Sequence, residues 1–277
     1  MQTLKMERKD YPAVGEAVYQ TTLRNGLKVF LLPKRDFNET YGIMTANFGS
    51  IDTSFIPRGS NQAVQYPAGV AHFLEHKLFE DENGQDLLQQ FVELGAESNA
   101  FTSFTKTSYL FLATDNVLEN VRLLQSLLEN AYFTEESVQR EQGIIQQEID
   151  MYKDNPDYCL FFHTLANLYP DTPLAEDIAG SVESIAEITV EDLDENFETF
   201  YHPSNMSLLL IGNFDLEKTI AVIREQHESL KGIDEESLIR RFPLALNPVI
   251  STGSVRMEVA SSKLAIGLRG SQSLVGT

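Results

Sequence analysis

The chain has 277 residues, of which 42% are hydrophobic, and 41 acidic against 21 basic side chains give it a formal net charge of −20. This composition is that of a globular protein with room for a sizeable core. The acidity argues against nucleic acid or an anionic membrane as a partner, because both are bound through basic patches, and it would suit a basic partner or substrate instead.

The N-terminal segment is predicted to contain three strands and a loop. Residues 18–23 and 27–33 should pair as strands joined by Asn25-Gly26, a dipeptide that favours the tight type I′ turn. A third strand is expected over 41–48. The stretch 49–68, which is rich in glycine and proline, is predicted to be a loop.

Helices dominate the remainder of the chain. Apolar side chains at helical spacing and capping residues predict helices that start at Gly69 or cover 86–94, 115–131, 134–155, 157–168, 190–200 and 216–230. Strands are expected over 97–103, 106–114 and 205–214. Strands that arrive as hairpins with helices between them predict an α+β fold, with a mostly antiparallel sheet and helices mainly on one face.

The C-terminal end is predicted to be a linker followed by an incomplete unit. Residues 231–249 have mixed charge and two prolines, which is typical of a linker. Two further strands are expected after residue 254, and two strands cannot form a core alone. We therefore expect a first domain over 1–230, a linker over 231–249, and the start of a truncated second domain over 250–277.

The most informative pattern is His72-x-x-Glu75-His76. On a helix the two histidines lie one above the other, so their imidazoles can share one metal ion. Glu75 is adjacent and could take a proton from a metal-activated water. Two nitrogen ligands and one carboxylate, with a fourth position left for water, suit zinc, and this order is the inverted zincin motif.

The alternative is that the motif binds no metal, because the same pattern also arises by chance on solvated helices. The neighbouring residues favour the metal site, since charged groups at the edge of an apolar face need partners. The apolar neighbours that should seat this helix in the core are Val70, Phe73, Leu74 and Leu78.

A third ligand is expected on the predicted helix over 134–155. Glu141 and Glu148 are seven residues apart, nearly two turns, so they project in almost the same direction. Glu148 could complete a His₂Glu set, and Glu141 could orient a ligand. The alternative is that both are ordinary solvated acids among the many on this helix.

Several segments together resemble the M16 family of zinc peptidases, which includes pitrilysin, insulin-degrading enzyme and mitochondrial processing peptidase, and most closely its bacterial YmfH-type members. The resemblance spans about residues 15–230. Four segments carry it at the family's relative spacings: GVAHFLEHKLFE (69–80), SNAFTSFTKTSY (98–109), EQGIIQQEIDMYKDNP (141–156) and ITVEDLDENFETFYHPSNMSLLLIGNF (188–214).

The resemblance implies a LuxS/MPP-like two-layer sandwich and a zinc-dependent metalloendopeptidase. It implies Zn²⁺ on His72, His76 and Glu148, with Glu75 as the general base and Glu141 as a supporting acid. Asn99 and Ala100 match the edge strand along which the family lays an extended substrate. The implied partners are a peptide or small-protein substrate and a second M16-like half, which could come from a partner subunit or a homodimer.

Two other functions stay open. The chain could be a catalytically inactive, partner-dependent M16-like subunit or scaffold, although the intact motif counts against this reading. It could also be a relative of S-ribosylhomocysteine lyase, but those enzymes use a catalytic cysteine, and Cys159 is predicted to lie on a helix with its side chain in the protein core. One cysteine, no signal-like N-terminus and no apolar run long enough for a membrane span indicate a cytoplasmic protein.

Overall fold

The computed structural model describes residues 6–57, 60–81, 84–127, 131–227, 240–241 and 246–270. Within these ranges, one sheet has the strand order β1-β2-β3-β9-β4-β8-β7 and a smaller one the order β10-β5-β6. The larger sheet consists of β1 (Glu7–Tyr11), β2 (Glu16–Thr22), β3 (Lys28–Pro33), β4 (Thr40–Ala46), β7 (Ala96–Thr102), β8 (Thr107–Ala113) and β9 (Met206–Gly212). The smaller consists of β5 (Ser54–Ile56), β6 (Val64–Gln65) and β10 (Arg240–Arg241).

The helices lie where the periodicity predicts them, with short additions. They are α1 (Val70–Lys77), α2 (Leu87–Glu93), α3 (Val117–Leu127), α4 (Glu135–Lys153), α5 (Pro156–Leu168), α6 (Val182–Glu187), α7 (Val190–Phe200), α8 (Leu216–His227) and the 3₁₀ turns η1 (Pro173–Ala175) and η2 (Pro203–Asn205). Thr134 and Thr189 close capping boxes at the starts of α4 and α7, which confirms those predicted starts. None of the described helices is long and apolar enough to cross a membrane.

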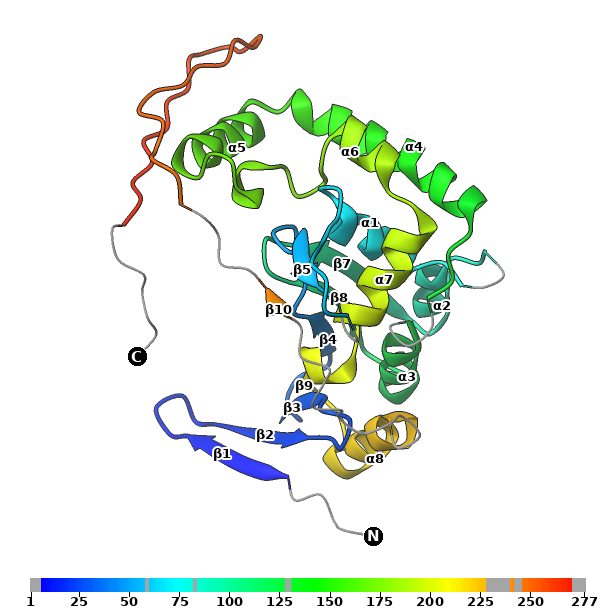
Figure 1. The fold of residues 1–277 in the computed structure, drawn as a ribbon. Coiled ribbons are helices and arrows are strands. Elements are labelled where there is room, and N and C mark those ends of the chain that lie inside the picture. The colour runs from blue at the N-terminus through cyan, green and yellow to red at the C-terminus, as the bar shows by residue number, and fades with distance from the viewer. Residues whose placement is uncertain are drawn as a thin grey trace.

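The larger sheet is antiparallel except where β3 runs parallel to β9. Along β4 and β9 buried residues alternate with half-buried ones, so one face of the sheet is covered and the other is more open. Helices α1 and α3 pack against β8 on the covered face. Figure 1 shows β1 and β2 at one end of the molecule, and α4 and α5 at the opposite end beyond β7. The predicted α+β class is confirmed.

The start of α1 is fixed by close backbone packing. Gly69, with φ 92°, precedes the helix, and a Cβ on it would lie 2.5 Å from the carbonyl oxygen of Ala179. A Cβ on Gly180, with φ 79°, would lie 2.5 Å from the carbonyl oxygen of Ala68. Only glycine fits two such contacts at positive φ. The turn before α6 therefore locks the helix that carries both histidines.

Three sequence predictions are wrong. The loop between β2 and β3 spans residues 23–27 and is not a type I′ turn, because only Gly26 has positive φ and the Asn25 side chain accepts from the backbone N–H of Leu27. The stretch 49–68 holds β5 and β6. Cys159 is half-buried, because α5 lies at the margin of the molecule and buries none of its residues.

The C-terminal segment also differs from its prediction. Described residues 246–270 form no strand; they run as extended chain beside α5 (Figure 1). The Ile250 N–H donates to the carbonyl of Asn167, and Arg269 donates to the carbonyl of Leu168. These hydrogen bonds run to the end of α5 and not to a strand, so the described residues 246–270 join neither sheet. The end of the helix predicted over 216–230 and most of the linker lie outside the described residues.

Candidate metal centre

Helix α1 presents His72, Glu75 and His76 on the side that faces α4 and β7. Val70, Phe73, Leu74 and Leu78 are at most 1% exposed, which confirms that they seat the helix in the core. His72 and Glu75 are each only 9% exposed, so the polar groups of the motif are themselves largely removed from solvent. Buried polar groups of this kind require partners.

The two histidines and Glu148 of α4 converge. Their ligand atoms all lie within 4.8 Å of one another. Glu148 Oε2 is 3.8 Å from His72 Nε2 and 3.4 Å from His76 Nε2. Two imidazole nitrogens and one carboxylate are a donor set that zinc accepts, so the group fits a metal ion. The structure thus brings together the three residues that the sequence nominated from two separate helices.

The two histidines differ in their outer hydrogen bonds. His76 Nδ1 lies 2.9 Å from Glu141 Oε1, so its Nε2 is left for a metal. His72 Nδ1 is buried and has no hydrogen-bond partner among the described residues. Glu141 is therefore within hydrogen-bond distance of one of the two imidazoles, on the same side of α4 as Glu148.

The charged groups of this site shift one another's pKa values. Burial and the neighbouring His76 lower the pKa of His72 to about 4. Burial would also lower the pKa of His76, but hydrogen bonds to Glu141 and Glu148 outweigh it and raise the pKa to about 9. The hydrogen bond between Glu148 and His76 lowers the pKa of Glu148. Without a metal, His76 is therefore protonated at neutral pH, with its Nδ1–H directed at Glu141 and its Nε2–H at Glu148.

Glu75 lies on the other side of His76, against β7. Burial raises the pKa of its carboxyl group, and hydrogen bonds from Thr102 partly oppose this. The Thr102 hydroxyl donates to Glu75 Oε2 at 2.5 Å. Glu75 is thus held by a residue at the end of a strand rather than by a metal-binding histidine.

Strand β7 forms the outer edge of the larger sheet. Asn99 is exposed, Ala100 is half-buried, and both line a cavity of about 550 Å³ together with Glu75 and His76. Their position on an unpaired edge next to the metal group agrees with a strand that could pair with an extended peptide.

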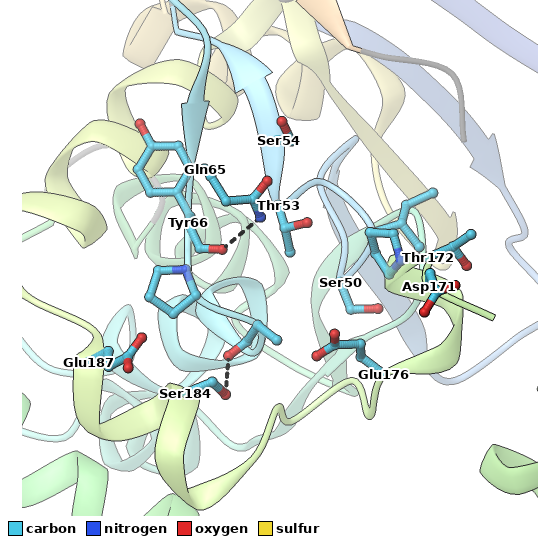
Figure 2. A pocket seen from close by; sticks show the side chains of 14 residues that line it. Ser50, Thr53, Ser54, Gln65, Tyr66, Asp171, Thr172, Glu176, Ser184 and Glu187 are labelled. Carbon is cyan, nitrogen blue, oxygen red and sulfur yellow. Dashed lines mark hydrogen bonds between the residues drawn. The ribbon is translucent and has the colours of Figure 1, made fainter. Parts of the chain in front are cut away.

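A second cavity of about 550 Å³ lies at the other end of α1, lined by Ser50, Tyr66, Glu176 and Glu187 among others. Figure 2 shows it between the segment that leads into α1 and the segment that carries Glu176. The Ser184 hydroxyl donates to the carbonyl of Ala68 at 2.9 Å, so α6 ties down the entry to α1 (Figure 2). This cavity contains none of the three candidate ligands.

Thr102 is not among the residues that the sequence patterns nominated. Its signal was the alternation along β7, in which Ala96, Ser98, Ala100 and Thr102 share the inward face. Two further histidines do not join His72 and His76: His163 is exposed, and His202 Nδ1 lies 2.8 Å from the Ser204 hydroxyl in η2. The side chain of His227 lies outside the described part of the chain.

Two family models match the chain. The insulinase model of peptidase family M16 matches residues 54–182, and the model described as the peptidase M16 inactive domain matches residues 187–273. The first match contains the whole candidate metal group.

The chain is also similar to individual proteins. It is 45% identical, over 94% of its length, to the Bacillus subtilis (strain 168) protein named "Uncharacterized zinc protease YmfH", of which it covers 61%. It is 27% identical, over 90% of its length, to a β subunit of mitochondrial-processing peptidase from Arabidopsis thaliana, of which it covers 46%. Among solved structures, an M16-like peptidase from Alicyclobacillus acidocaldarius matches 87% of the chain with a TM-score of 0.76 and 37% identity, and 53% of that structure is covered. The chain therefore spans about half to three fifths of the length of these relatives.

Proposed function

Because this chain belongs to the peptidase family M16, we propose that it is the metal-binding half of a zinc-dependent endopeptidase. The observation that carries the proposal is the convergence of His72, His76 and Glu148 beside the buried carboxylate of Glu75. Three protein ligands with an open fourth position are typical of catalytic rather than structural zinc sites.

His72 and His76 would hold the ion through Nε2, and Glu148 through Oε2. Zinc bound there would lower the pKa of a water molecule and polarise a peptide carbonyl. Glu141 would keep the His76 ring in the orientation that presents Nε2. Glu75 would accept a proton at its carboxylate and later return it to the leaving amine. Burial raises the pKa of that carboxyl group, which favours both steps near neutral pH.

The edge strand β7 would bind the substrate. An extended peptide could add to the open edge at Asn99 and Ala100, where backbone hydrogen bonds give affinity for many sequences. We propose a peptide or small protein as the substrate class, and a second M16-like half, from the same polypeptide, a partner subunit or a second copy, to complete the binding site. The domain division at 1–230, 231–249 and 250–277 stays a prediction.

The experiment compares Glu75→Gln with wild type in the full-length protein, and uses Glu93→Gln on α2 as an exposed-acid control. We expect bound zinc in all three by mass spectrometry, and at least about a hundredfold loss of peptide cleavage only in Glu75→Gln. Normal cleavage by Glu75→Gln would refute the proposal. Zinc-free, inactive wild-type protein would instead support the alternative of a non-catalytic M16-like subunit.

A further inference from the structure

We infer that Thr102 is the positioning residue for the Glu75 carboxylate, acting from the last position of the edge strand β7. This inference rests on the proposed function, because it concerns the group proposed as the general base. The hydrogen bonds around Glu75 support it.

Thr102 faces Glu75 because of the strand geometry. Side chains alternate along β7, and the even-numbered residues 96–102 point toward the covered face, where α1 packs. The hydroxyl of Thr102 lies 2.5 Å from Glu75 Oε2, and a backbone hydrogen bond from Thr102 reaches the same carboxylate. Two donors from one rigid residue fix both the position and the rotation of a carboxylate better than one flexible donor.

The direction of the hydroxyl bond follows from counting hydrogens. A hydroxyl has one hydrogen. The buried Thr107 donates its hydroxyl hydrogen to the carbonyl oxygen of Phe48, at 3.0 Å, because a carbonyl can only accept. Thr107 therefore cannot donate to Thr102, whose oxygen is 3.3 Å away. The hydrogen of Thr102 is left for its closer and charged neighbour, Glu75 Oε2.

The buried tyrosines behind this pair form a separate contact. The hydroxyls of Tyr109 and Tyr201 lie 3.0 Å apart, and both side chains are buried. Among the described residues, no hydrogen bond joins either hydroxyl to Glu75, so this buried network is separate from the Thr102 contact and its tyrosines are structural.

The consequence is a link between substrate and base. The strand that would pair with the substrate at Asn99 and Ala100 also holds the base, two residues farther along. A peptide aligned on this edge is thereby aligned with the Glu75 carboxylate. Misplacing a reacting group by about 1 Å can cost about a hundredfold in rate.

The test uses zinc-loaded full-length protein and a fluorescence-quenched peptide that the wild type cleaves. Thr102→Val removes the hydroxyl at nearly constant volume, and Thr102→Ser restores it. Matched controls are Thr105→Val, an exposed threonine in the adjacent turn, and Tyr201→Phe in the buried network. We expect Thr102→Val to lower kcat about 10- to 100-fold with KM within about twofold and zinc content unchanged. Thr102→Ser and both controls should stay within about threefold of wild type.

A loss of activity in Tyr201→Phe equal to that in Thr102→Val, or a wild-type kcat in Thr102→Val, would overturn the inference. Crystal structures of the zinc-loaded variants give a readout that does not depend on activity: the Glu75 carboxylate should rotate or become disordered in Thr102→Val only. If the wild type cleaves no peptide, the proposed function fails, and an unmoved Glu75 in Thr102→Val would separately refute the role of Thr102.

Discussion

The Nδ1 atom of His76 lies 2.9 Å from Oε1 of Glu141, on the opposite side of the imidazole ring from the Nε2 atom that faces Glu148. One side chain of α4 thus contacts Nδ1 of the ring, and another, two turns later, contacts Nε2, the nitrogen proposed to bind the metal. Carboxylates bonded to the far nitrogen of a metal-binding histidine fix the ring and make it more basic.

Replacing Glu141 should therefore weaken the metal site without removing a ligand. We expect Glu141→Ala to lower zinc affinity about 10- to 100-fold, and Glu141→Gln to lower it less, since an amide oxygen still accepts a hydrogen bond. Competition with a fluorescent chelator measures this. The control is Asp150→Asn, an exposed acid of α4 paired with Lys153, which should leave the affinity unchanged. Equal affinities for Glu141→Ala and wild type would contradict the role of Glu141.

Zinc affinity should rise with pH up to about pH 9. The hydrogen bonds to Glu141 and Glu148 outweigh burial and raise the pKa of His76 from 6.5 to about 9, so at neutral pH the metal must displace a proton from it. The pKa of His72, lowered to about 4 by burial and by His76, makes that ring neutral throughout this range. We expect up to about a tenfold gain in affinity per pH unit between 7 and 9. A flat profile would contradict proton displacement from His76.

The same raised pKa predicts how the stability of the metal-free protein varies with pH. The folded chain holds a proton on His76 that the unfolded chain releases above pH 6.5. The stabilisation from this group is therefore complete below about pH 6.5 and is lost as the pH rises through about 9. Urea unfolding of metal-free wild type and Glu141→Ala between pH 6 and 10 should show a smaller decline in the variant. Parallel curves would count against the assignment.

Glu80, just beyond the C-terminal end of α1, should stabilise the fold. It pairs with Lys77, whose side chain is fully buried, and with Arg140, which is 53% exposed. Glu80→Ala leaves the buried Lys77 charge without this partner, so we expect it to lower the free energy of unfolding by about 3 kcal/mol. Arg140→Gln removes only an exposed partner and should cost less than about 1 kcal/mol. Urea unfolding of both variants compares them, and equal costs would argue against the buried pair.

Gly180 should be far less tolerant of a side chain than Gly15. Both have positive φ, but a Cβ on Gly180 would lie 2.5 Å from the carbonyl oxygen of Ala68, while nothing lies within 4 Å of one on Gly15. We expect Gly15→Ala to cost about 1 kcal/mol, from backbone strain alone. Gly180→Ala should cost at least about 2 kcal/mol more through the clash, and should lower zinc affinity because α1 shifts. Denaturant unfolding and zinc titration of both variants test this, and similar values would show that the contact relaxes freely.

Local patterns in the sequence predicted most of the helices and the metal-binding motif. The pair His72 and His76 follows from helical spacing, and the capping boxes at Thr134 and Thr189 follow from residues three apart, because these features depend only on neighbours in the chain. The shortest elements were not predicted. The six residues of α6 and the brief strands β5 and β6 carry too little periodicity to separate them from loop, and contacts with distant segments stabilise them.

The sequence by itself determined which residues could bind a metal and the class of the fold, because the spacing of side chains on one helix and the alternation along a strand are properties of the local backbone. The sequence nominated Glu148 and Glu141 by their spacing but left open that they are ordinary solvated acids, and only the tertiary structure decided that these acids of α4 meet the histidines. That choice depends on how α4 packs against α1, and it selects Glu148 and Glu141 from a helix with several exposed acids. It also placed Thr102 beside Glu75, since 27 residues of chain separate the two and only the packing of α1 on β7 brings them to 2.5 Å.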